Sequence, residues 1–520
     1  MLVSLFNDVI GPVMRGPSSS HCAAALRIGR LARDLMAGDV AGVVAQYDRH
    51  GSLATTHRSQ GSDMGLFGGL LGWDATDERL PQSAQAIGEA GIDVRTEVVD
   101  TGDEHPNTYR LTLSNAHERH TLIALSTGGG MVEAVSIDGV PLSIGGDYWE
   151  TLVRLEQAPG GDLEALARAL DADEVLTHEA NGNQLLQIKA QHPLGEAQLA
   201  AELGELGWTR RLAPVLPILS RKGVSVPFTT CAEMLEHDGD GDSPLWRLAA
   251  EYEAARGNLS EDEVLARMVE IVRIVRASIE QGIAGTAYQD RVLSYPCAEL
   301  KARMERGQLL DAGMLNRIVL YVTALMAVKS AMGVIVAAPT AGACAALPGA
   351  CVGAADHLGL DDEAVARAML AGGIIGVFIA THSTFAAEVC GCQAECGAAS
   401  GMAAAALCAL GGGTARQGIA AASMALQNSL GMICDPVANR VEVPCLGKNV
   451  LAASNALSCA NVALGGFDPV IPLDEVIETM DRVGRALPRE LRCTALGGLS
   501  ITRTAREIER RLNGEKGEWM

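Results

Sequence analysis

Three cysteines in the second half of the chain have the residue type and the surroundings of a metal or cluster site. Cys392 lies in Cys-Gly-Cys-Gln, Cys434 in Ile-Cys-Asp-Pro-Val and Cys445 in Val-Pro-Cys, in the order C-x41-C-x10-C. Their Ala- and Gly-rich, nearly uncharged surroundings disfavour hard cations, whereas thiolates select soft metals or iron–sulfur clusters. Three thiolates leave one iron of a cluster open, and an open iron permits Lewis-acid chemistry on a hydroxyl group. The pattern predicts removal of water from a hydroxylated substrate.

Two further cysteines in the same segment, Cys390 and Cys396, prevent an assignment from spacing alone. A radical-SAM pattern fails, because Ala399 stands where its third cysteine is needed. A zinc site fits less well, since no C-x2-C pair or histidine pattern accompanies these thiols. His382 is the one histidine nearby, and it is equally compatible with a core position.

A turn near the N-terminus gathers hydroxyl and imidazole groups at the start of an expected helix. Its sequence is Gly-Pro-Ser18-Ser19-Ser20-His21. Serine hydroxyls and the first N–H groups of a helix suit a carboxylate, and Ser20 or His21 can move a proton. The alternative is a helix N-cap with surplus serines.

Three other short segments carry polar groups that suit an amino-acid substrate. His105-Pro-Asn107 precedes a strand, Thr340 belongs to Pro-Thr-Ala-Gly-Ala-Cys, and Lys448-Asn449 follows the third cysteine closely. Each also has a structural interpretation. The His105 segment can be an ordinary turn, the Thr340 segment can serve close helix packing, and Lys448 can be a solvated surface lysine.

Hydrophobic periodicity divides the chain into three parts. Residues 1–148 mix helix and strand signals, with a hairpin over residues 108–125. Residues 149–216 follow the order strand, helix, strand, strand, helix, strand, a ferredoxin-like pattern that resembles an ACT domain. Residues 217–520 show helical spacing almost throughout. We predict an α+β fold with an N-terminal mixed α/β domain, a central ACT-like βαββαβ domain and a C-terminal all-α domain that carries the cysteines.

Composition and charge exclude several classes of partner. The net charge of −22 over 520 residues disfavours nucleic acid and anionic membranes. The first residues lack the pattern of an export signal, so a cytoplasmic location is expected. Residues 330–355 carry no charge, but two prolines and many small residues favour buried helices over a membrane span. The acidic loop over residues 236–243 lacks the glutamate that a calcium loop requires.

With these motifs in view, the chain resembles the iron–sulfur-dependent L-serine dehydratases over nearly its whole length. The GPSSSH, HPNT and Gly-Leu-Leu-Gly segments resemble the family's β-type domain, and the PTAGAC, GCQ, CDPV and VPC segments its α-type catalytic domain. The resemblance implies a [4Fe–4S] cluster on Cys392, Cys434 and Cys445. It also implies L-serine as substrate, pyruvate and ammonia as products, a place in amino-acid degradation and gluconeogenesis, and a homodimer.

The chain departs from the family pattern at several positions. Gln60 stands where the family usually has histidine, and His57 is the nearby residue that can take over its role. Cys390 reads as an insertion, Cys396 is an addition, and no cysteine ends the chain. These departures keep a relative of serine open as substrate.

The expected mechanism assigns roles to the other candidates. Iron coordination of the β-hydroxyl and carboxylate activates the substrate, and His21 or Ser20 takes the α-proton. Ser18, Ser19, His105, Asn107, Thr340, Lys448 and Asn449 are expected to bind the substrate. Such a site requires the domains to close over one cleft, within a protomer or across a dimer. Alternatives are a lyase acting on threonine or cysteine, and a non-catalytic amino-acid or redox sensor. Pyridoxal phosphate is disfavoured, since lysines are few and no Gly-rich phosphate cup is paired with one.

Overall fold

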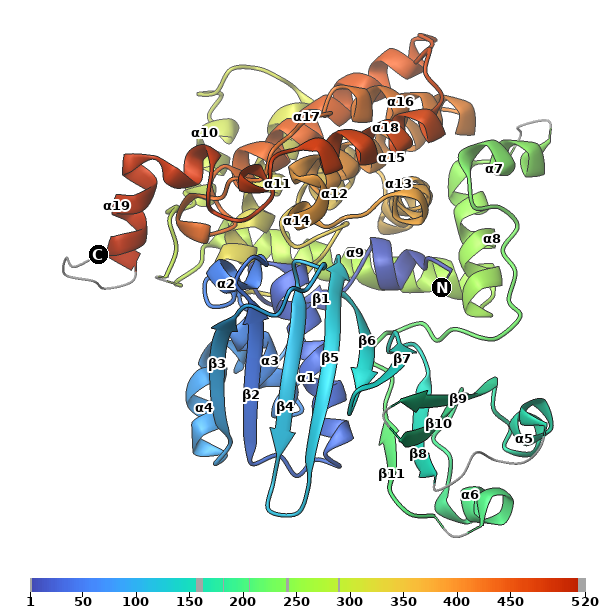
Figure 1. Cartoon of the computed structure of the whole chain (residues 1–520). Helices are drawn as coiled ribbons and strands as arrows, with labels where there is room; N and C mark the ends of the chain where they lie inside the picture. The colour runs from blue at the N-terminus through green and yellow to red at the C-terminus, as the bar shows by residue number, and fades with distance from the viewer. Residues whose placement is uncertain are drawn as a thin grey trace. The chain divides into compact units, whose positions relative to one another are not determined.

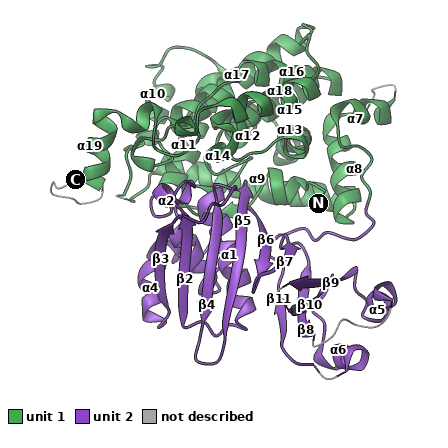
Figure 2. Cartoon of the chain, in the orientation of Figure 1, with its two compact units in different colours: residues 1–19, 225–520 green, residues 20–224 purple. Residues whose placement is uncertain are grey.

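The computed structural model describes residues 2–155, 162–180, 182–204, 206–239, 243–288 and 290–512, with only the backbone at position 183. They form two compact units, one of residues 1–19 and 225–520 and one of residues 20–224 (Figure 2). We call these the helical unit and the sheet unit. Position 181 of the predicted ACT-like hairpin, positions 240–242 of the acidic loop and the end of the chain after residue 512 lie outside the described residues. The predicted domain boundaries at residues 148 and 216 stay predictions.

A six-stranded sheet forms the larger part of the sheet unit (Figure 1). Its strand order is β3-β2-β4-β5-β6-β7, with β2 and β3 parallel and the other neighbours antiparallel. The predicted hairpin over residues 108–125 is confirmed as β4 and β5, with Leu111 opposite Leu122. The strands are β2 (Gly42–Asp48), β3 (Asp93–Val99), β4 (Thr108–Ser114), β5 (Arg119–Gly128), β6 (Met131–Ile137) and β7 (Val140–Ile144).

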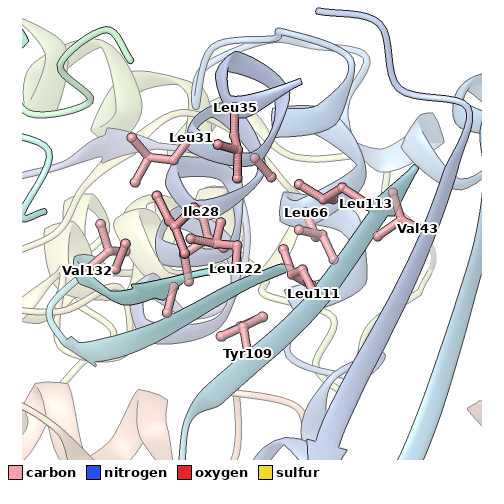
Figure 3. Close-up of a cluster of buried hydrophobic side chains, with 14 of the residues drawn as sticks. Ile28, Leu31, Leu35, Val43, Leu66, Tyr109, Leu111, Leu113, Leu122 and Val132 are labelled. Atoms are coloured by element: carbon pink, nitrogen blue, oxygen red, sulfur yellow. The ribbon is translucent and has the colours of Figure 1, made fainter. Parts of the chain in front are cut away.

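Helices α1 (Ala24–Leu35) and α3 (Ser62–Leu70) pack closely against each other in this unit, which also holds α2 (Leu53–Thr56) and α4 (Ser83–Glu89). A Cβ at Gly69 would lie 2.1 Å from the Leu26 carbonyl oxygen, so glycine is required at this contact. Leucine and isoleucine side chains of α1 and α3 meet apolar residues of the strands in one core (Figure 3). The Gly-Leu-Leu-Gly segment therefore serves helix packing.

The βαββαβ order predicted for the ACT-like part is observed. The sheet order β11-β8-β10-β9, antiparallel throughout, is that of a ferredoxin-like fold. Leu152, Leu185 and Leu212 of this sheet belong to the core of the six-stranded sheet, which explains why both sheets form one unit. The elements are β8 (Trp149–Leu155), α5 (Leu163–Ala169), β9 (Glu174–Ala180), β10 (Asn183–Ala190), α6 (Glu196–Leu203) and β11 (Thr209–Leu212).

The helical unit surrounds a central helix, α15 (Cys396–Leu410), which contacts α12, α13, α16 and α17. Every residue from Cys396 to Cys408 is buried, as expected of a helix that is apolar on all sides. The predicted α+β class is thus confirmed. The other helices are α7 (Cys231–Asp238), α8 (Leu245–Gly257), α9 (Glu261–Ala284), α10 (Cys297–Glu305), α11 (Met314–Ser330), α12 (Ala346–Leu358), α13 (Asp362–His382), α14 (Ala387–Cys390), α16 (Ala415–Gln427), α17 (Cys445–Leu464), α18 (Leu473–Ala486) and α19 (Arg503–Leu512).

Among the described residues, α13 alone is long and apolar enough to cross a membrane by length and composition. Its most apolar window is 78% buried inside the protein, as in the core helix of a globular domain. The uncharged residues 330–355 end α11, form the short strand β12 (Ile335–Val336) and enter α12, so they are no single span.

The first residues of the chain pack within the helical unit. They form a π-helical turn, η1 (Leu5–Val9), and a short strand, β1 (Val13–Met14), which pairs with β12. The boundary between the two units therefore falls inside the GPSSSH motif, between Ser19 and Ser20.

Candidate functional site

Cys392, Cys434 and Cys445 come from three separate segments of the helical unit and are 2%, 5% and 6% exposed. Cys392 begins the 3₁₀ turn η4 (Cys392–Ala394), and Cys445 begins α17. Gly391, just before Cys392, has a positive φ of 71° and lies so close to its neighbours that a Cβ would be 2.9 Å from the Met432 carbonyl oxygen. The glycine of the GCQ motif therefore sets the backbone turn that presents the Cys392 thiol.

The thiols of this region interact with one another. Cys396 and Cys434 hydrogen-bond to Cys392, and these bonds, with the nearby Lys448 ammonium, hold the pKa of Cys392 well below its ordinary value. Cys434 also hydrogen-bonds to the thiol of Cys493, and both bonds raise the pKa of Cys434. Burial raises the pKa of Cys445 to about 12. All thirteen cysteines are described and none forms a disulfide.

Small side chains pack around four of these thiols. The apolar cluster that contains Cys392, Cys396, Cys434 and Cys493 is otherwise made almost wholly of alanines, and Met432 packs against it from a partly buried position. Methyl groups offer no ligand atom to a metal, so the thiols are the ligands that this apolar cluster itself provides. The alanines are Ala343, Ala346, Ala387, Ala399 and Ala452.

Lys448 places a positive charge near all three predicted ligands. Its Nζ donates to the Ile433 carbonyl at 2.6 Å and to Asp435 Oδ1 at 3.1 Å. Burial acts to lower the pKa of Lys448, but the surrounding cysteines and Asp435 outweigh burial and raise it. The ammonium therefore stays charged and offsets negative charge on the thiolates.

The other predicted residues of the helical unit hold loops together. Asn449 is fully buried, and its Nδ2 donates to the carbonyls of Gly342 at 2.8 Å and Cys445 at 2.9 Å. It thereby bridges the PTAGAC and VPC segments. The Ser19 hydroxyl accepts a hydrogen bond from the Ala341 N–H at 3.2 Å, and Ser18 is half-buried beside it in the chain.

Thr340 contacts a carboxylate, Glu395, that the sequence patterns did not identify. Its hydroxyl donates to Glu395 Oε1 at 2.8 Å, and Glu395 Oε2 lies 3.9 Å from the Cys392 sulfur. Burial, together with the Cys392 thiolate, raises the pKa of Glu395 well above its ordinary value. A Cβ at Gly342 would lie 2.9 Å from Glu395 Oε1, which explains the glycine in PTAGAC.

Two further residues near the thiols were also missed. Cys493 is 5% exposed, and its N–H donates to the Cys434 carbonyl at 3.0 Å. Lys329 is fully buried, donates to the Val441 carbonyl and acts to lower the pKa of Cys445. Glu395 and Lys329 had a signal, since each is a charged residue in or beside an apolar run. Cys493 had none, because it lies far from the recognised motifs.

The sheet unit carries the remaining predicted residues. His21 is fully buried, its Nε2 lies 2.8 Å from Thr56 Oγ1, and burial followed by the effect of His57 lowers its pKa to about 3. His21 is therefore neutral at physiological pH and a weak base. The Ser20 carbonyl accepts a hydrogen bond from the Ser126 hydroxyl at 2.6 Å.

The HPNT loop presents an amide whose groups make no hydrogen bond within the described residues. Asn107 is 0% exposed, and both its Nδ2 and its Oδ1 lack a partner there. His105 Nδ1 accepts from the Asn107 N–H at 3.2 Å, and burial lowers the pKa of His105. Buried amides without partners are rare, and such a group is suited to a polar ligand.

His57 is an imidazole of this unit that a carboxylate orients. Its Nδ1 lies 2.8 Å from Asp63 Oδ1, and the two side chains are 13% and 17% exposed. Its ring is 5.4 Å from that of Tyr47. A carboxylate that holds one ring nitrogen fixes the tautomer and leaves the other nitrogen for proton transfer. Gln60, where the family usually has histidine, is buried.

The fold and the site together define an α+β protein with a buried, thiol-rich centre in a helical domain. Comparison with known proteins extends this description. Residues 240–500 match the serine dehydratase alpha chain family, and the chain belongs to that family.

Relatives cover both parts of the chain. It is 36% identical over 255 residues to a probable L-serine dehydratase alpha chain of Bacillus subtilis, covering 49% of this chain and 85% of the relative. It is 40% identical over 146 residues to a probable L-serine dehydratase beta chain of the same organism, covering 28% and 66%. It is also 26% identical over 514 residues to L-serine dehydratase 1 of Escherichia coli, covering 96% and 99%.

Proposed function

We propose that this protein dehydrates L-serine to pyruvate and ammonia with a [4Fe–4S] cluster held by Cys392, Cys434 and Cys445. One observation carries the proposal: the buried thiols of Cys392, Cys434 and Cys445 come from three separate segments, and Cys392 lies close enough to affect the pKa of both others, in a chain of the serine dehydratase family. The substrate is inferred from the names of relatives that match nearly the whole chain.

The donor set fits a cluster better than a single ion. Within the described part of the chain, no three His, Cys, Asp or Glu side chains are grouped to hold one metal ion. An iron–sulfur cluster takes protein thiolates on different iron atoms, so its ligands surround a volume instead of a point. When bound, a cluster with one iron lacking a thiolate supplies a Lewis acid for a hydroxyl group.

The residues around the thiols would stabilise that group. Lys448 places a positive charge beside all three ligands. Thr340 holds Glu395 in place next to Cys392, and Asn449 fixes the start of α17 through the Cys445 carbonyl. These contacts hold the ligand segments at defined positions before any group binds, which lowers the cost of assembly.

The proton acceptor is proposed to lie in the sheet unit. His57 is oriented by Asp63 and partly exposed, whereas His21 is fully buried with a pKa of about 3. We therefore place His57 as the base and His21 as a neutral neighbour. The unpartnered Asn107 amide is suited to the substrate's carboxylate or ammonium group.

The test is pyruvate formation from L-serine by anaerobically reconstituted protein, with iron and sulfide measured on the same sample. Cys392→Ser, Cys434→Ser and Cys445→Ser should each lose visible absorbance and turnover. Cys408→Ser, on α15 outside the thiol cluster, should retain both.

Three results would redirect the proposal. Faster turnover of L-threonine or L-cysteine than of L-serine would change the substrate. An intact cluster that binds serine without turnover would favour a sensor. Full iron content in all three ligand variants would refute the cluster assignment.

A further inference from the structure

Residues 2–19 lie on the helical unit through specific contacts with α8. Glu253, fully buried on α8, accepts hydrogen bonds from the Ser4 hydroxyl at 2.6 Å and the Leu5 N–H at 2.7 Å. The Tyr252 hydroxyl donates to the Val3 carbonyl at 2.9 Å, and Arg256 Nε donates to the Leu2 carbonyl at 3.2 Å. A buried carboxylate that captures a side chain and a backbone N–H defines one position for the segment.

Two glycines of α13 make a receptor for the apolar side chains of this segment. A Cβ at Gly373 would lie 2.2 Å from Leu5 Cδ2, and a Cβ at Gly376 would lie 2.2 Å from Val9 Cγ1. Leu5 and Val9 are both 0% exposed. Neither glycine has a positive φ, so the absent side chains serve to make room and not to permit a turn.

The second half of the segment reaches the PTAGAC loop. β1 pairs with β12, Gly11 N donates to the Ala337 carbonyl at 2.9 Å, and Ala337 N donates to the Pro12 carbonyl at 3.0 Å. The last contact joins Ser19 to Ala341, next to Thr340. The segment therefore connects the α13 receptor to the loop that positions Glu395 beside Cys392.

In the sequence, residues 2–19 are followed directly by the sheet unit. Ser20, the next residue, begins the sheet unit, so the segment belongs by contacts to one unit and by sequence to the other. The Bacillus subtilis relatives of this chain are separate alpha and beta chains, whereas this chain is similar to both.

We propose that residues 2–19 are a docking arm by which the sheet unit binds the helical unit, with α8 and the glycine face of α13 as its receptor. The occupant of this receptor is the segment of residues 2–19 of the chain itself. The arm keeps the two units associated even when the connection around residues 221–223 is cut. The proposal goes beyond the proposed function and does not depend on it, because it concerns association and not turnover.

The experiment uses the full-length protein with a protease site inserted at the exposed residues 221–223. After cleavage, the two fragments should elute together in size-exclusion chromatography. Gly376→Val fills the space of Val9 and should weaken association of the cut fragments by about tenfold or more. Gly88→Ala is the matched control, since a Cβ there meets nothing within 4 Å.

A second variant separates docking from folding of α13. Leu5→Asp changes the arm and leaves the receptor intact, and it should release the cut fragments while the uncut variant keeps its circular dichroism. Separation of the cut wild-type fragments would overturn the proposal. Continued co-elution of both cut variants would overturn it equally, because other contacts would then hold the units.

Discussion

At the residue scale, the imidazole groups of the sheet unit have different environments and should respond differently to mutation. His57 is held by Asp63 at 2.8 Å, and His21 is bound to Thr56 and fully buried. The reactivity of each imidazole therefore depends on the side chain that binds it, since the residue type is the same. Neither partner could be assigned from sequence, since proximity in the chain does not show which hydroxyl or carboxylate an imidazole meets.

His57→Ala should lower kcat by a factor of about 10² to 10⁴, the range expected for loss of a general base. Asp63→Asn should lower it less, because it disturbs the tautomer but leaves the imidazole. Steady-state kinetics with iron analysis checks this, with His50→Ala, an exposed histidine, as control. Near-full activity of His57→Ala together with a large loss in His21→Ala would return the role to His21.

Gly391 should be intolerant of a side chain. It has a φ of 71° and lies against Met432 and Leu487, so Gly391→Ala adds backbone strain and a clash. We expect a loss of about 1–3 kcal/mol in unfolding free energy, and reduced iron content, by denaturation and iron assay. Gly447→Ala is the control, since a Cβ there meets nothing within 4 Å. Equal stability of the two variants would contradict this account of the GCQ turn.

At the scale of elements, the buried Glu253 of α8 makes docking of residues 2–19 depend on pH. Burial raises its pKa from 4.5 to about 7, against the hydrogen bonds from Ser4 and Leu5 and the charge of Arg256, while Asp8 acts with burial. The folded state thus binds this proton more tightly than the unfolded state. The resulting stability is fully present below pH 4.5 and is lost as the pH rises to about 7.

Glu253→Gln should remove that contribution. The pKa shift of Glu253 corresponds to a difference of about 3 kcal/mol in unfolding free energy between the low-pH and high-pH ends of this range. Denaturant midpoints at pH 5 and pH 8 test it, compared between wild type and Glu253→Gln so that other titrating groups cancel. An identical pH dependence in both proteins would show that Glu253 does not titrate in this range.

The elements differ in how well their patterns predicted them. The strand alternation over residues 108–125 and the βαββαβ order were correct, since period-two patterns and turn residues act locally. Domain membership of residues 2–19 was not visible in the sequence. Leu5, Val9 and Ile10 show only that the segment is buried somewhere, and α13 lies more than 350 residues away.

At the scale of the whole molecule, the predicted cluster ligands all belong to one of the two units. Cys392, Cys434 and Cys445 join segments of the helical unit, and the sheet unit supplies none of them. A group that ties together distant segments stabilises the unit that holds it, because unfolding must release the bound group.

Removal of the metal should therefore affect the two units unequally. Calorimetry of anaerobically reconstituted protein and of the same protein after chelation should show a lower transition temperature for the helical unit alone. Protease fragments, assigned by mass, identify which unit opens first. Equal destabilisation of both units would contradict a cluster confined to the helical unit.

The sequence by itself determined the candidate ligands and the fold class. Cysteine chemistry, the glycine and proline residues beside each thiol, and the apolar periodicity act over a few residues, and their meaning can be read along the chain. They indicated Cys392, Cys434 and Cys445 and the change from strands to helices.

Only the tertiary structure decided what surrounds those thiols. Lys329 and Cys493 reach the site through packing of segments far apart in sequence, and the same packing engages the Asn449 amide with backbone groups. It also places residues 2–19 with the helical unit. Such contacts depend on which side chains fit together in three dimensions, and no local pattern encodes that fit.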